Sequence, residues 1–76
     1  MSAGPGLVVT YVMESQVDNL PWFCEERTHD DEQARAWAPW LEDFCRVHKL
    51  TRVRLAREVR NTEGELVAKS ILRETQ

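Results

Sequence analysis

The alternation of apolar and polar positions begins with a strand pattern. Residues 7–13 are rich in β-branched and aromatic side chains, which predicts a strand with apolar residues on both faces. Residues 20–26 suit a short second strand, although Pro21 would restrict it to a sheet edge or to its own first position. The N-terminal third therefore predicts one strand and leaves open whether residues 20–26 form a second.

A helical repeat follows. Apolar side chains recur at the spacing of one helix face: Ala34, Trp37, Leu41 and Phe44. This spacing predicts an amphipathic helix over residues 30–48, capped by Thr28 or Asp30. Pro39 breaks the pattern, because an internal proline lacks the N–H that the helix needs and presses on the preceding turn. We expect either a kink there or a helix that stops and restarts.

The last third of the chain alternates as a hairpin does. In residues 51–60, Val53 and Leu55 share one face with Arg57, which is the charged exception on that side. Residues 61–64 have the composition of a turn, and residues 65–73 form the returning strand. A four-residue loop would place Val59 opposite Leu66.

Together these elements predict an α+β fold, a two-layer sandwich in which an antiparallel sheet of three to four strands (β-(β)-α-β-β) carries one Pro-kinked helix on one face. A chain of 76 residues suffices for one domain, so we expect a flexible N-terminus over residues 1–6 and a single domain over residues 7–76. No run approaches the roughly 20 apolar residues of a membrane span, and nothing marks a signal peptide. The expected location is cytoplasmic.

Charge divides the chain into two parts. Residues 14–43 carry a net charge of −7 and residues 44–76 one of +4, which together give −3. The candidate acidic patch consists of Glu25, Glu26, Asp30, Asp31 and Glu32. The candidate basic face consists of Arg52, Arg54, Arg60, Lys69 and Arg73. Solvated surface charge accounts for both, but the acidic patch could also meet a basic protein groove, and the basic face could contact phosphates.

Trp22 and Trp40 are the candidate aromatic contacts. Trp37 lies at the centre of the helix stripe and is expected in the core, whereas Trp40 lies about 60° from it, at the edge of the stripe. Consecutive strand residues point to opposite faces, so one of Trp22 and Phe23 should leave the core. Either all four rings fill one core, or an exposed ring anchors a partner.

Catalytic and metal-binding patterns are weak. Four side chains have zinc-ligand chemistry: Cys24, His29, Cys45 and His48. The predicted helix would hold the two histidines roughly 28 Å apart, however, and two cysteines are too few for a disulfide framework. Cys45 and His48 also lack an orienting group for nucleophilic chemistry. We expect free thiols, no catalytic residue, no metal ligand, no cofactor, and a protein that is not an enzyme.

The stretches GLVVTYVMES, THDDEQARAWAPWLEDFCRVHKL and TRVRLAREVRNTEGELVAKSILRE set the order of strand, helix and hairpin. This order resembles that of several very small phage-encoded inhibitors of bacterial defence, among them anti-CRISPR proteins. The resemblance is one of architecture, and it implies a non-enzymatic inhibitor that binds a protein partner, such as a nucleoprotein complex, stoichiometrically. The alternatives are a nucleic-acid-binding domain using the basic face, and a homodimer formed through an open sheet edge. No membrane partner is expected.

Overall fold

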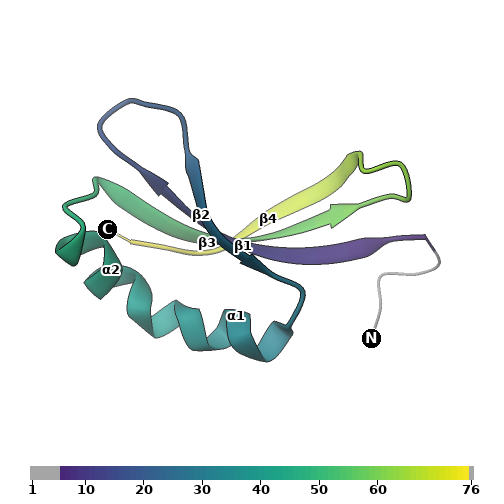
Figure 1. Ribbon diagram of the computed structural model, residues 1–76, viewed down its shortest axis with the longest axis horizontal. Coiled ribbons are helices and arrows are strands. Elements are labelled where there is room, and N and C mark those ends of the chain that lie inside the picture. The colour runs from purple at the N-terminus through teal and green to yellow at the C-terminus, as the bar shows by residue number, and fades with distance from the viewer. Residues whose placement is uncertain (1–5, 76) are drawn as a thin grey trace.

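A computed structural model describes residues 6–75 of the chain. Its elements, in order, are β1 (Val8–Gln16), β2 (Phe23–Thr28), α1 (Asp31–Trp37), the 3₁₀ helix η1 (Ala38–Trp40), α2 (Leu41–Val47), β3 (Arg52–Arg60) and β4 (Leu66–Glu74). The strands form one antiparallel sheet in the order β2-β1-β3-β4, with the helical segments on one side of it (Figure 1). The predicted two-layer α+β fold is confirmed. The flexible N-terminus predicted over residues 1–6 lies outside the described residues, apart from Gly6.

α1 begins at the cap that the sequence indicates. The carboxylate of Asp30 accepts a hydrogen bond from the Glu32 amide at 3.0 Å, and this satisfies one free N–H of the first turn. The hydroxyl of Thr28 accepts in turn from the Asp30 amide at 3.0 Å. Both candidate capping residues therefore take part. Within residues 6–75, no helix is long and apolar enough to cross a membrane.

Pro39 lies in η1, between the two α-helical segments. The amide of Ala38 donates to the Arg35 carbonyl, and the amide of Leu41 donates to the Ala38 carbonyl. These tighter 3₁₀ bonds form where Pro39 has no N–H for the α-helical pattern. The structure does not show the Pro-kinked helix of the expected fold. Instead the helix stops and restarts through η1.

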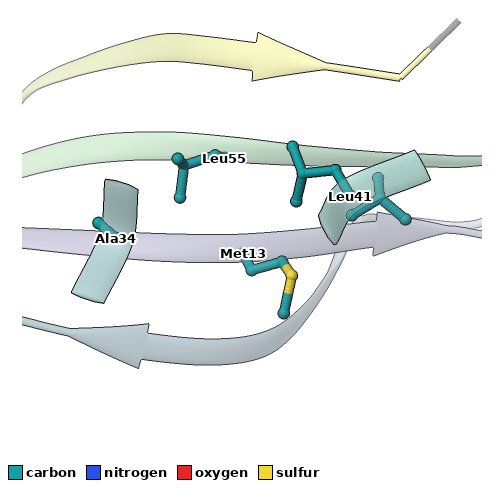
Figure 2. Close-up of a cluster of buried hydrophobic side chains, with 5 residues drawn as sticks. Met13, Ala34, Leu41 and Leu55 are labelled. Atoms are coloured by element: carbon teal, nitrogen blue, oxygen red, sulfur yellow. The ribbon is translucent and has the colours of Figure 1, made fainter. Parts of the chain in front are cut away.

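The core lies between the helices and the two central strands. Its buried members are Met13, Ala34, Leu41, Val53 and Leu55. Figure 2 shows Met13 and Leu55 on the strands together with Ala34 and Leu41 from the helices. Trp37 packs against this cluster, as its place in the stripe predicts. Of the described residues, none from β4 belongs to it.

The hairpin is confirmed, but its register differs from the expected one. Arg60 pairs with Leu66 and Val59 pairs with Ala68, so the expected opposition of Val59 and Leu66 is wrong. The pairing shifts at each end of β4, where one extra residue bulges from the ladder. In Figure 1 the turn of this hairpin lies at the right, away from both helices.

Candidate functional site

An ion-pair network covers the open face, which is the face of the sheet opposite the helices. Glu14 accepts from Arg54 Nε at 2.8 Å and from Lys69 Nζ at 3.0 Å. Lys69 also lies 3.2 Å from Glu58, whose other oxygen pairs with Arg60 at 3.2 Å. The network therefore joins β1, β3 and β4 across the sheet.

Glu14 is held by two cations of this network. Burial raises the pKa of Glu14, but the hydrogen bonds from Arg54 and Lys69 outweigh burial, and the pKa lies below its ordinary value of 4.5. Val12 and Ala56 are 2% and 0% exposed on the same face, although none of the described helices covers it. On that face Glu14, Arg54 and Glu58 occupy the next alternate positions of β1 and β3, and the stems of long charged side chains can cover apolar neighbours.

Trp22 lies against two arginines of β3. The guanidinium carbons of Arg54 and Arg52 are 3.9 Å and 5.2 Å from the centroid of its ring, which is cation–π distance. Arg52 also lies 3.5 Å from the Glu74 carboxylate. Trp22 is half-buried, whereas Phe23 is 64% exposed. Neither ring belongs to the core cluster, although one of the two was expected to remain there: Trp22 is covered by the arginines and Phe23 is open to solvent.

The five residues of the predicted basic face do not form one surface. Arg52, Arg54, Arg60 and Lys69 are each paired with a carboxylate. Arg73 lies on the helix side of the sheet, where it lines a cavity. The structure thus places three of these residues in the ion-pair network, pairs Arg52 separately with Glu74, and places Arg73 apart from them.

The predicted acidic patch lies where β2 leads into α1. Three of its members have local roles: Glu25 accepts from Ser15 Oγ at 2.6 Å, Asp30 caps the helix, and Asp31 pairs with Arg35 at 2.9 Å. The other two are exposed, namely Glu26 and Glu32. The patch remains largely open to solvent, with part of its charge used for helix capping and pairing.

The most prominent aromatic surface is the Trp40 patch, defined here as Trp40, Phe44, Val47 and His48. Trp40 and Val47 are 64% and 66% exposed, and their spacing of seven residues puts them on the same side of the helix. The rings of Phe44 and His48 lie 4.4 Å apart. The patch, with Asp43 and Arg46, lines a hollow of about 320 Å³. Trp40 therefore stands out of the core, unlike Trp37.

β4 forms a second apolar surface, and the sequence analysis did not identify it. Every residue of this edge strand is exposed. Four large apolar side chains remain 45–58% exposed: Leu66, Val67, Ile71 and Leu72. The alternation placed such residues in the core, but the helical layer packs on β1, β2 and β3. The exposure of these side chains follows from the position of β4 at the end of the sheet, beyond the strands that the helices cover.

Metal and thiol chemistry is sparse in the part of the chain that the structure describes. Residues 6–75 contain no group of three or more His, Cys, Asp or Glu side chains placed to hold a metal ion. Cys24 and Cys45 are free thiols, and Cys45 donates a hydrogen bond to the Leu50 carbonyl at 3.2 Å. These side chains define no candidate catalytic centre.

Comparison with known proteins identifies no relative. No protein-family model, curated protein sequence or solved structure matches this chain. The candidate sites therefore rest on the exposure, charge and geometry of the surfaces described above.

Proposed function

We propose that this protein is a small, non-enzymatic protein-interaction module and that the Trp40 patch is its principal contact. The observation that carries the proposal is the 64% exposure of Trp40 beside the equally exposed Val47. Leaving this apolar area in water is unfavourable unless a partner covers it, and tryptophan is among the residues most enriched at binding hot spots. The hollow beside the indole offers a place for a partner side chain.

The proposed action is stoichiometric inhibition of a larger nucleic-acid-handling complex, as the resemblance to phage-encoded inhibitors implies. The charge of the chain supports this choice of partner. The acidic patch lies at the N-terminal end of the helical layer that also carries Trp40. A basic groove built for nucleic acid would attract this end of the molecule and accelerate association.

The alternative of direct nucleic-acid binding is less well supported. Phosphate contacts require Lys and Arg side chains that are free to replace the counterions bound to the nucleic acid. Four of the five candidate cations are instead paired with carboxylates of their own chain. The positive electrostatic potential of the hairpin face is therefore smaller than its arginine content suggests.

The test is affinity capture from a bacterial lysate with three immobilised proteins: the wild type, Trp40→Ala and Glu42→Ala. Glu42 is an exposed residue of α2, so its truncation is the matched control. We expect the wild type and the Glu42 variant to retain the same complex, and Trp40→Ala to reduce its recovery about thirtyfold, as loss of a hot spot does. Equal recovery by all three would contradict the proposal. So would tight nucleic-acid binding by the pure protein with a steep salt dependence.

A further inference from the structure

A groove separate from the Trp40 patch lies on the helix side of the sheet, between α1 and β4. This α1–β4 groove has a volume of about 440 Å³. Leu55 and Leu72 contribute to its apolar lining, and Tyr11 places an aromatic ring beside them. The volume is in the range of sites that bind a ligand or a short peptide segment. None of its lining residues belongs to the Trp40 patch.

Two arginines at this groove have no side-chain partner within residues 6–75. Among residues 6–75, no hydrogen bond or ion pair is made by the side chain of Arg57 or Arg73. The other strand arginines each donate to a side chain: Arg27, Arg52, Arg54 and Arg60. Guanidinium groups bind carboxylates through short, charge-assisted hydrogen bonds, so these two are available to an incoming acid.

The other charges at the groove cancel each other. Asp31 and Arg35 also line it, but they form an ion pair at 2.9 Å. The net positive charge of the groove therefore comes from Arg57 and Arg73. Arg57 is the charged residue on the otherwise apolar side of β3, and its position at the groove allows its guanidinium group to bind an acidic ligand.

The outer edge of β4 can accept a further strand. β4 ends the sheet, so the backbone groups on its far side have no neighbouring strand from the part of the chain that the structure describes. Between its two bulges, residues 68–71 pair regularly with β3 and so present a regular edge. An extended peptide added here would gain main-chain hydrogen bonds, and alternate side chains would point toward the groove.

We propose that the α1–β4 groove binds an extended, acidic segment of a protein partner, which adds to the edge of β4. One carboxylate of the segment pairs with the guanidinium groups of Arg57 and Arg73. An apolar side chain two positions away packs on Leu55 and Leu72. This binding surface is additional to the Trp40 patch and does not depend on it.

The charge of the groove favours such a partner over a second copy of this chain. Two copies joined by antiparallel pairing of β4 about a two-fold axis would bring both pairs of groove arginines, Arg57 and Arg73, onto the same side of the joined sheet. Like charges facing each other are unfavourable in a sheet. The two bulges would also limit how far β4 could pair with another β4. An acidic strand meets neither obstacle.

The experiment is selection from a display library of random linear peptides on the full protein. The selection is repeated on the Arg57→Gln/Arg73→Gln double variant and on Lys49→Gln, which removes a positive charge away from the groove. We expect peptides rich in Asp and Glu, with affinity reduced about tenfold or more by the double variant and unchanged by Lys49→Gln. If the double variant does not fold, Arg73→Gln alone gives the test, because Arg73 is exposed.

Two further measurements fix the binding mode. Amide hydrogen exchange with the best peptide bound should slow in β4, and light scattering of the free protein should give a monomer. The proposal is overturned by a selection without acidic enrichment, by peptides that the double variant retains, by protection confined to the Trp40 patch, or by a dimer that already protects β4. Trp40→Ala should bind the peptides as the wild type does, so failure here is distinct from failure of the proposed function.

Discussion

Arg54 contacts Trp22 and Glu14 at the same time. Its guanidinium carbon lies 3.9 Å from the centroid of the indole, and its Nε donates to the carboxylate at 2.8 Å. One side chain of β3 thereby fixes both β1 and the segment that leads into β2. Residues that the sequence suggests as partner contacts also hold the sheet together at this end.

Replacement of Trp22 should therefore destabilise the fold. We expect Trp22→Ala to lower the free energy of unfolding by about 1–3 kcal/mol, because it removes a cation–π contact and a half-buried ring. Urea denaturation measures the change. Trp40→Ala is the matched control, and its effect should stay within about 0.5 kcal/mol. Equal losses at the two positions would contradict the different environments of the two indoles.

Stability should fall in acid because of Glu14. Its pKa is lower in the folded protein than its ordinary value of 4.5, so the unfolded chain binds the proton more readily. The stabilisation is complete above pH 4.5 and is lost as the pH falls through the folded pKa. Urea denaturation at a series of pH values tests this. In the Glu14→Gln variant, the free energy of unfolding should fall less steeply as the pH is lowered. If the variant lost stability in acid as steeply as the wild type, the acid sensitivity would belong to other carboxylates.

Truncation of Leu41 should affect stability far more than truncation of Leu20. Leu41 is 0% exposed at the centre of the core, so Leu41→Ala should cost about 2–5 kcal/mol. This is a large share of the about 4–11 kcal/mol typical of a domain of this size. Leu20 is 61% exposed, and Leu20→Ala should have little effect. Thermal unfolding of the two variants, followed by circular dichroism, gives the comparison.

Thr75 should stabilise the end of β3 through its hydroxyl group. The Val53 amide donates to Thr75 Oγ1 at 3.0 Å, and the Thr75 amide donates to the Val53 carbonyl at 2.9 Å. Thr75→Val keeps the shape but leaves a buried N–H unpaired, which should cost about 1–3 kcal/mol. Thr75→Ser retains the hydroxyl and should lose less. If Thr75→Ser were destabilised in urea and Thr75→Val were not, packing of the methyl group rather than the hydroxyl would be the stabilising contact.

Local periodicity was sufficient to predict most of the architecture. The helix stripe placed Ala34 and Leu41 in the core, and the alternation of the hairpin placed Val53 and Leu55 opposite them, as the structure confirms. These features depend on neighbours within a few positions of the chain. The sequence left open whether Trp40 is buried or exposed, because a residue at the edge of an apolar stripe can face either the core or the solvent.

The register of β4 and the pairing of charges could not be predicted from these patterns. Each bulge in β4 changes which residues face each other, and no short motif marked the extra residues, Val67 and Leu72. Glu14 and Arg54 meet across β1 and β3 although they are 40 positions apart. Such contacts follow from strand order and register, so the sequence shows a run of arginines where the structure has ion pairs.

The three indoles occupy three different surroundings: Trp37 against the core, Trp22 on two guanidinium groups, and Trp40 in water. The molecule consequently carries its own optical probes, one for each region. Variants that keep a single tryptophan would report core melting, fraying of the sheet end or burial of the outer helix surface separately, through the wavelength of their emission and without an attached dye.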